Sequence, residues 1–497
     1  MAGEVPNSLV RGIAVHHSFA RVLTIHGTHQ LKVEWCVGYH VKGHNIFLED
    51  GIETQNVIQY NLMMSSISSL TLLQSDITVA SYWITNPYNI VRRNHAAGGD
   101  FYGFWYEIKE HPDGPSATGD ICPMGMRLGI SEDNVAHSNR RFGLRIFKLS
   151  ARKYPCLPTQ DESLIDPYSA NPPIHSQFDN YTLWRNEECG FLGEELGYAT
   201  IENFRTADSR KGGLQFHKTN FTKELVIAHN ALVVGYSQGN APDNMDYVYN
   251  EARGVIASRT DGLRFSDIRF YNFGPTMTPL QSCSECYIYK LWVTGGKTTE
   301  FEQISYNNIQ GNYIFWEKWR REIFIDLDGT LTQPFYSQLA VGAQSRATIS
   351  PNRPSLANNE KCHTIMNGNW NDSVWCDQDV TLRGLLFTNA NPKQTFNGLD
   401  FKVFLLSDPM QDISAETEDQ FSKEIEIIIK KSKDIPKSWA MPFATNKYYN
   451  VHWKWGVDFT HVSLAPSRLW DSNDGIVLRF NYTDDRELFE IGKWYQE

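Results

Sequence analysis

The stretch Gly43-His44-Asn45-Ile46-Phe47-Leu48 is a glycine followed by a short strand pattern, and similar phrases return four times. The later copies are Gly103-Phe104-Trp105-Tyr106, Gly143-Leu144-Arg145-Ile146, Gly190-Phe191-Leu192 and Gly213-Leu214-Gln215-Phe216. Successive glycines are 60, 40, 47 and 23 residues apart, close to multiples of a repeat of roughly 20–23 residues, and such a period indicates a solenoid. Short strands with no room for helices between them predict a parallel β-helix, in which each coil buries its inner side chains only by stacking on its neighbours.

The composition allows a large core and argues against one class of partner. The chain has 497 residues, of which 41% are hydrophobic and 13% aromatic. The net charge of −11 argues against non-specific nucleic-acid binding, which needs a basic surface. A strand pattern begins almost at once, near Val10, with no signal peptide before it. We therefore expect a piece of a longer protein, or a gene model without its front.

The pattern divides the chain into three parts. Residues 1–345 predict the β-helix, interrupted by two stretches rich in Pro, Ser, Asp and Gly, 109–128 and 152–178, which we expect to protrude as loops. Residues 346–380 form a connector rich in Pro and Asn. Residues 381–497 predict a β-rich, sandwich-like module. The predicted fold class is all-β, a right-handed parallel β-helix with this C-terminal module.

Cysteines and glycosylation motifs favour an extracellular or lumenal setting. Cys362 and Cys376 flank a polar loop, as the ends of a disulfide-closed loop would. Four Asn-x-Ser/Thr motifs are present, at Asn180, Asn220, Asn371 and Asn481. Together these features predict a disulfide-bonded glycoprotein.

A motif of another kind lies at 323–332. Its apolar strand ends in Asp326-Leu327-Asp328-Gly329-Thr330 and resembles the first motif of the haloacid dehalogenase superfamily. That resemblance implies an aspartate nucleophile beside Mg²⁺, but the alternating β and α units which that fold needs do not follow. The ordinary interpretation is an acidic turn whose carboxylates accept backbone N–H bonds. An intermediate one is a calcium site built on Asp326 and Asp328, since carboxylates are hard oxygen ligands.

Several phrases resemble one family in the family's own order, from about residue 7 to about residue 460. They are Leu23-Thr24-Ile25-His26-Gly27-Thr28, Gly43-His44-Asn45-Ile46-Phe47-Leu48-Glu49-Asp50-Gly51, Asn94-His95-Ala96-Ala97-Gly98, Gly103-Phe104-Trp105, Gly114-Pro115-Ser116, Ala136-His137-Ser138-Asn139, Asp326-Leu327-Asp328-Gly329, the Cys362 to Cys376 loop and Lys447-Tyr448-Tyr449-Asn450-Val451-His452-Trp453. The ordered set is similar to the CEMIP, transmembrane hyaluronidase and fibrocystin-L family.

The resemblance implies a β-helix in an extracellular, cell-surface or membrane-tethered protein. In the best-known members it implies depolymerisation of hyaluronan, with a G8 domain upstream of the β-helix. Fibrocystin-L-like relatives imply a different function, a non-catalytic ectodomain module for adhesion or receptor architecture. Both functions stay open, and with them whether the chain is an enzyme.

Candidate site residues follow from stacking, because equivalent positions of neighbouring coils lie about 4.8 Å apart. Hydrolysis of a glycosidic bond needs two carboxyl groups, one of them protonated. The predicted catalytic residues are Glu49, Asp50, Asp100 and His137. The predicted substrate-binding residues are His26, His44, Trp105, Arg140 and Arg141. Of these, Arg140 or Arg141 would bind a glycan carboxylate. The alternative is that these polar residues stack in ladders that satisfy backbone groups.

Overall fold

The computed structural model describes most of the β-helix and, beyond it, separate strands. The described residues are 3–70, 73–157, 171–219, 225–237, 252–258, 262–282, 297–316, 322–334, 347–351, 362–364 and 373–376, with the strand backbones 382–389, 401–406, 428–430, 438–444, 448–453 and 459–465. Among them no helix is long and apolar enough to span a membrane.

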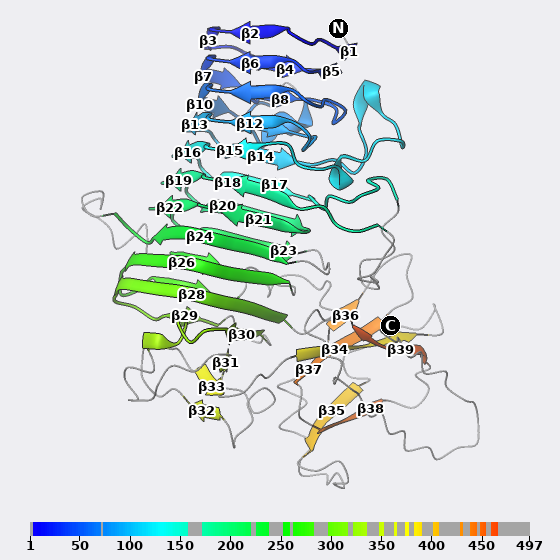
Figure 1. The fold of residues 1–497 in the computed structure, drawn as a ribbon, viewed down its shortest axis with the longest axis vertical. Coiled ribbons are helices and arrows are strands. Elements are labelled where there is room, and N and C mark those ends of the chain that lie inside the picture. Colours follow the sequence, from blue (N-terminus) through cyan, green and yellow to red (C-terminus); the bar gives the residue numbers. More distant parts are fainter. Residues whose placement is uncertain are drawn as a thin grey trace.

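The chain winds into stacked coils, and each coil contributes a strand to three faces (Figure 1). Face A contains β2 (Leu9–Arg11), β6 (Lys32–Glu34), β9 (Val57–Gln59), β12 (Ile90–Arg92), β15 (Ser131–Glu132), β18 (Ser176–Asp179) and β21 (Ala199–Glu202). Face B contains β3 (Ala14–His16), β7 (Val37–Lys42), β10 (Leu62–Ile67), β13 (His95–Ala97), β16 (Val135–His137), β19 (Thr182–Trp184) and β22 (Arg205–Ala207). The longer strands β24 (Val226–Val234), β26 (Leu263–Phe273) and β28 (Lys297–Ile309) run through both faces.

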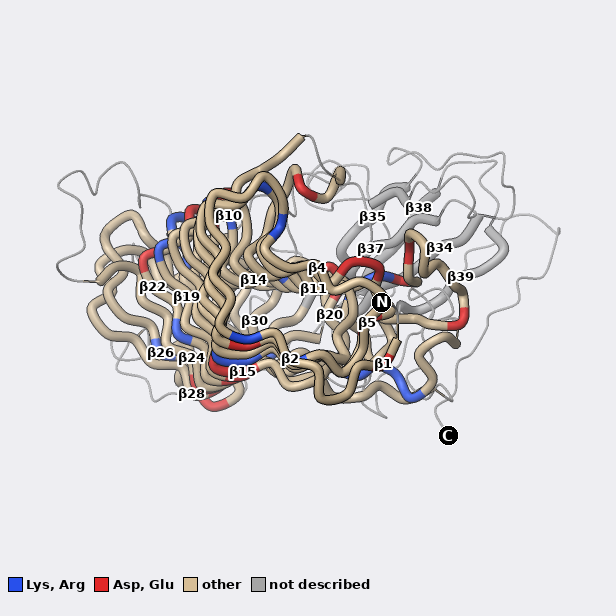
Figure 2. The backbone as a smooth tube through the Cα atoms, turned by 90° about the horizontal axis from the view of Figure 1, so that it is seen from above, with Lys and Arg blue, Asp and Glu red and all other residues tan. Residues whose placement is uncertain are grey.

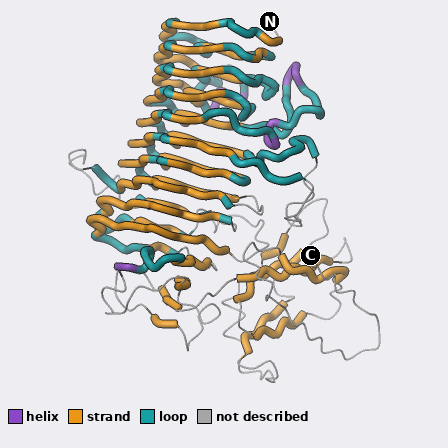
Figure 3. The backbone as a smooth tube through the Cα atoms, viewed as in Figure 1, coloured by secondary structure: helices purple, strands orange, loops and turns teal. Residues whose placement is uncertain are grey.

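Face C is a separate sheet of parallel strands. It contains β4 (Leu23–Ile25), β8 (Ile46–Leu48), β11 (Ala80–Ile84), β14 (Tyr102–Glu107), β17 (Phe142–Phe147), β20 (Cys189–Leu196), β23 (Gly212–Thr219), β25 (Arg253–Ile256), β27 (Thr278–Gln281) and β29 (Ile314–Phe315). Outside these faces, β1 (Gly3–Glu4) pairs with β5 (Thr28–His29). Short 3₁₀ turns, η1 (Gln74–Ile77), η2 (Gly114–Ser116) and η3 (Pro123–Gly125), lie in the connections (Figure 3). The predicted parallel β-helix is confirmed.

The core is a column of side chains in register along the solenoid axis. On face C, Phe104 pairs with Leu144, which pairs with Phe191, and all three are completely buried. Seen along the axis, successive coils superimpose, and charged residues gather on face A around β2 and β15 (Figure 2). There Glu34 accepts hydrogen bonds from Gln59 and Arg11. The Gln59 bond, then the neighbouring Lys32 and Arg11, lower the pKa of Glu34 to about 2.

The corner between faces A and B holds a polar ladder. One residue per coil has a left-handed backbone there, among them Trp35, Tyr60, Arg93, Asp133, Asn180 and Asn203. The buried asparagines that follow bond from coil to coil. The Asn61 amide donates to Asn94 (3.1 Å), and the Asn94 amide to Asn134 (3.3 Å). These side chains also bond to backbone groups at the corner, as buried polar groups must.

The repeated glycines stack because there is no room for a side chain. A Cβ on Gly103 would lie 2.6 Å from the carbonyl oxygen of Gly143, and one on Gly143 would lie 2.9 Å from that of Gly190. Gly213 continues the column. Gly43 does not belong to it: Ile46 pairs with Tyr82 and Tyr82 with Phe104. Asn45 and Ser81 therefore occupy the ladder position, and Gly43 lies in the turn before β8.

The parallel ladder ends at β30 (Glu322–Asp326), which pairs in parallel with β28 and antiparallel with β31 (Ala347–Pro351). Antiparallel pairing continues through β32 (Cys362–Thr364) and β33 (Ser373–Cys376), joined by the predicted Cys362–Cys376 disulfide, which is confirmed. β34 (Leu382–Asn389), β36 (Ile428–Lys430), β37 (Ser438–Ala444) and β39 (Phe459–Ala465) form an antiparallel sheet, and β35 (Phe401–Leu406) pairs with β38 (Tyr448–Trp453). The predicted boundaries near 345 and 380 lie outside the described residues.

Candidate functional site

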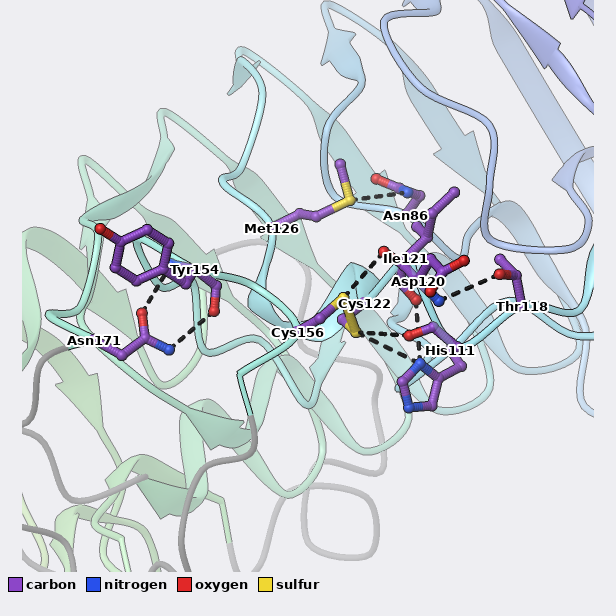
Figure 4. The surroundings of a disulfide bond; sticks show 11 residues. Asn86, His111, Thr118, Asp120, Ile121, Cys122, Met126, Tyr154, Cys156 and Asn171 are labelled. Atoms are coloured by element: carbon purple, nitrogen blue, oxygen red, sulfur yellow. Dashed lines mark hydrogen bonds between the residues drawn. A yellow bond between two sulfur atoms is a disulfide. The ribbon is translucent and has the colours of Figure 1, made fainter.

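A disulfide that the sequence analysis missed ties the two protruding loops together. Cys122 in the first loop is bonded to Cys156 in the second (Figure 4). The signal was present in the sequence, since each cysteine lies in one of the two stretches that break the repeat. The His111 ring packs beside the bond, with Nδ1 3.5 Å from the Cys122 sulfur.

The first loop lies against the C-terminal edge of face C. The Asp113 N–H donates to the carbonyl oxygen of Asp50 (3.0 Å). Gly114 has φ of +60° and lies so close that an added Cβ would be 2.8 Å from Asp50 Oδ1. The loop therefore covers Asp50, which is only 3% exposed.

Three of the predicted site residues meet at this edge. β4 and β8 are neighbours in register, so His26 follows one strand where Glu49 and Asp50 follow the other. The His26 Nδ1 atom lies 3.1 Å from Glu49 Oε2 and 3.5 Å from Asp50 Oδ2. Among the described residues this is the one group of three His, Cys, Asp or Glu side chains whose ligand atoms converge, all within 4.8 Å of one another.

The structure places the other two predicted catalytic residues elsewhere. Asp100 precedes β14 at the opposite edge of face C, where its Oδ2 accepts the Ser68 N–H (2.9 Å) and its Oδ1 lies 3.6 Å from Arg140. His137 is on face B, with its ring stacked on Trp184 at a centroid distance of 4.2 Å. The four residues do not share one groove, and their catalytic roles stay predictions.

Two predicted substrate-binding residues are buried beneath the outer surface of face C. His44 is completely buried and its ring lies 4.3 Å from that of Trp83. Burial, aided by the positive charge of Arg21, lowers the pKa of His44 to about 3. Trp105 is 7% exposed and belongs to an aromatic cluster on the outer side of the sheet. His44 therefore supports the surface from below rather than presenting a group to a ligand.

Above Trp105 lies a cluster of charged residues that the sequence analysis did not single out. The Arg145 guanidinium is 4.6 Å from the Trp105 ring centroid, and its Nε donates to Glu194 Oε2 (2.6 Å). Glu194 Oε1 lies 3.1 Å from His217 Nδ1. Glu107 ends the neighbouring β14, two strands from Glu194 and in register with it through Phe147. We call Glu107, Arg145, Glu194 and His217 the outer cluster.

The two carboxyl groups of the outer cluster differ in pKa. Burial raises the pKa of Glu107. Burial would also raise that of Glu194, but the hydrogen bond with His217 and the charge of Arg145 outweigh it and lower the pKa. Two carboxyl groups on one face of a sheet, with pKa values shifted in opposite directions, can divide acid and base roles between them.

Arg141 extends the cluster along the same face. Its Nε donates to Glu188 Oε1 (2.9 Å) and its Nη1 to the Tyr102 hydroxyl (3.3 Å), which also accepts from Arg145 (3.0 Å). Predicted as a substrate-binding residue, Arg141 is 39% exposed in its side chain. Cationic groups held over aromatic rings therefore line this part of face C.

The repeated phrase contained the signal for the outer cluster. Aligned on their glycines, Glu107, Glu194 and His217 are each four residues after Gly103, Gly190 and Gly213. Trp105 and Arg145 are each two residues after theirs. Alignment of the copies would have placed these side chains in two columns.

The aspartates at 326 and 328 form an acidic turn. Asp326 is completely buried, and its two oxygens accept from the N–H groups of Gly329 (2.9 Å) and Thr332 (2.9 Å). Asp328 accepts from the Gln303 and Thr330 N–H groups. These contacts match the ordinary interpretation, and a buried carboxylate bonded in this way is not available as a phosphatase nucleophile. A calcium site here stays a prediction.

Comparison with known proteins identifies relatives along the whole chain. The CEMIP β-helix family description matches residues 1–144. Fibrocystin-L of Homo sapiens is 29% identical over 500 residues, which cover 97% of this chain and 11% of the relative. The cell migration-inducing and hyaluronan-binding protein of Mus musculus is 34% identical over 49% of this chain and 21% of its own length. The cell surface hyaluronidase of Danio rerio is 28% identical over 36% of this chain and 16% of its own length.

The chain thus spans between about a tenth and a fifth of the length of these relatives. The parallel coils of residues 1–144 are the part that the family description covers, and the fibrocystin-L match continues beyond them to the antiparallel strands. The predicted resemblance is confirmed: this chain is similar to fibrocystin-L and to the CEMIP-type hyaluronidases, and its residues 1–144 match the CEMIP β-helix.

Proposed function

We propose that this chain is an extracellular or cell-surface β-helix that binds and processes a carboxylate-bearing polysaccharide of the hyaluronan type on the outer side of face C. The observation that carries the proposal is the outer cluster, in which Glu107 and Glu194 have pKa values shifted in opposite directions beside Arg145. The names of two relatives, a hyaluronan-binding protein and a cell surface hyaluronidase, support the substrate class. A membrane tether stays a prediction.

The chemistry assigns a role to each group. A raised pKa keeps Glu107 protonated at higher pH, so it can donate a proton to the glycosidic oxygen as the general acid. A lowered pKa keeps Glu194 ionised, as the nucleophile or general base requires. The positive charges of Arg145 and Arg141 would attract the sugar carboxylates.

A second candidate function is a non-catalytic ectodomain module. The observation in its favour is that fibrocystin-L matches 97% of this chain, whereas the hyaluronan-related proteins match 49% or less. This candidate predicts polysaccharide or protein binding on the same face without cleavage.

The test is depolymerisation of labelled hyaluronan, chondroitin and a neutral glucan between about pH 4.5 and 7.5, with binding measured in parallel. We expect Glu107→Gln and Glu194→Gln each to lower cleavage by about 10²–10⁴-fold, while Glu132→Gln on face A leaves it unchanged. Glu49→Gln and Asp50→Asn examine the site predicted from the sequence. If the unmodified chain binds the polysaccharide without cleaving it, the second candidate is favoured. If the chain shows no binding and no cleavage, the proposal is contradicted.

A further inference from the structure

We infer that His26, Glu49 and Asp50 form a binding site for one first-row divalent cation, of which Zn²⁺ is the best probe. The three side chains are held at one edge of face C by the register of β4 and β8. Their ligand atoms converge within 4.8 Å. The inference is independent of the outer cluster and of the proposed function.

The separations of the His26 nitrogen from the two carboxylates match those of a metal site. Zinc bonds of about 2.0–2.2 Å place neighbouring nitrogen and oxygen ligands roughly 3.3–3.5 Å apart at tetrahedral angles. The His26 Nδ1 atom is 3.1 Å from Glu49 Oε2 and 3.5 Å from Asp50 Oδ2. One imidazole and two carboxylates would occupy three positions and leave a fourth for water or a ligand.

Asp50 supplies an independent observation. Its Oδ2 atom is buried and accepts no hydrogen bond from the described residues, although the side chain is only 4% exposed. A buried carboxylate oxygen without a donor is costly, and this one is directed at the His26 ring. A cation would satisfy it.

The other charged side chains nearby do not neutralise the Asp50 carboxylate. Lys109, which packs against Gly51, has its ammonium group 3.2 Å from Asp113. Glu53 is occupied by backbone donors, accepting from the N–H groups of Gly27 (2.9 Å) and Gly51 (2.9 Å). Two carboxylates against one histidine therefore carry excess negative charge, which a divalent cation neutralises.

Several hydrogen bonds fix the turn around Asp50, which favours a preformed site. Glu53 ties the turns that follow β4 and β8 to each other, and the first loop closes over Asp50 from outside. His26 and Glu49 stay partly exposed, at 45% and 26% of their side chains, so an ion has a route in. An imidazole ligand favours zinc or another first-row ion over calcium, which takes oxygen ligands.

The test is titration of the chelator-treated full chain with Zn²⁺ against a chromophoric competitor, with thermal unfolding followed in parallel. We expect one equivalent to bind and to raise the unfolding temperature. His26→Ala and the nearly isosteric Asp50→Asn should each weaken binding by about 10–100-fold or more. His16→Ala, which removes an exposed histidine on β3, is the matched control.

Folding of each variant is checked by its circular dichroism spectrum, so that lost binding is not mistaken for lost structure. The inference is overturned if Zn²⁺ does not bind saturably, or if Asp50→Asn and His26→Ala bind as tightly as the unmodified chain. It is also overturned if His16→Ala abolishes binding, because the ion would then sit at the exposed histidines of face B. Glu107→Gln should leave Zn²⁺ affinity unchanged, which separates this site from the outer cluster.

Discussion

His44 shows how completely the environment of one residue can change its chemistry. Its ring is stacked on Phe47 and buried, and its Nδ1 accepts the Ala80 N–H (3.0 Å). Only a neutral imidazole can accept this bond. His44, which follows Gly43 in the turn before β8, is therefore a structural acceptor beneath the sheet, although its type suggested a ligand-binding role.

This burial makes stability depend on pH. The pKa of His44 falls from 6.5 to about 3 on folding, so below pH 6.5 the unfolded chain binds a proton that the folded chain does not. The contribution of neutral His44 to the free energy of unfolding is complete above pH 6.5. It is lost as the pH falls towards 3, at about 1.4 kcal/mol per pH unit. The free energy of unfolding can be measured in urea at about pH 6.5 and at about pH 5. Between these two pH values it should fall by about 2 kcal/mol more in the unmodified chain than in His44→Gln. Equal losses in the two proteins would contradict the prediction.

At the scale of the elements, the glycine column determines how closely the strands of face C approach. Any side chain at Gly103 would meet the backbone of the next strand, which cannot move away without breaking the ladder. The column thus explains why the phrase that reveals the repeat begins with glycine.

Gly103→Ala should lower the free energy of unfolding by about 1–3 kcal/mol, because overpacking against backbone forces the strands apart. Gly119→Ala is the matched control, since an added Cβ there meets no atom within 4 Å. Denaturant unfolding of both variants checks this prediction. Similar stabilities for the two would show that the sheet accommodates the extra methyl group.

The loops are elements of another kind, because their position depends on links across the fold. The Cys122–Cys156 disulfide joins the two protruding loops, and the Asp113 N–H bond attaches the first loop to Asp50. Disulfides typically stabilise by about 2–4 kcal/mol through the unfolded state. Here the Cys122–Cys156 disulfide also holds the first loop, which covers Asp50 in the proposed cation site.

For the whole molecule, the decisive property is that the strands of each coil pair only with strands of the neighbouring coils. Stability in such a solenoid is close to a sum of local and nearest-neighbour contributions. Damage should therefore stay near the coil that carries it. The core column provides completely buried residues at both ends for a test, with Ile58 in β9 and Ile268 in β26.

Hydrogen exchange should reveal this locality. Ile58→Ala, which removes about 2–5 kcal/mol of packing, should speed exchange in β6, β9 and β12 and leave β26 and β28 nearly unchanged. Ile268→Ala should give the reverse pattern. A uniform increase along the chain in both variants would show that the solenoid unfolds as a single cooperative unit.

Part of the candidate site could be predicted from which residues follow the strands of neighbouring coils. His26, Glu49 and Asp50 were predicted as site residues because they end strands one coil apart, and they do meet. Asp100 and His137 were grouped with them because they also flank repeat phrases. The structure places them on another edge and another face, since the connections between coils differ in length and the repeat alone does not assign a residue to a face.

The sequence by itself determined the parallel β-helix, because stacking requires a glycine and alternating apolar residues at recurring positions, and that requirement is local to each coil. It also indicated the Cys362–Cys376 disulfide and the acidic turn at Asp326, whose partners lie within a short stretch. Only the tertiary structure decided the Cys122–Cys156 bond, the burial of His44 and the placement of Glu107 and Glu194 on the same part of face C. Those depend on which coils become neighbours and on how deeply side chains are buried, and both are properties of the stack rather than of any one repeat.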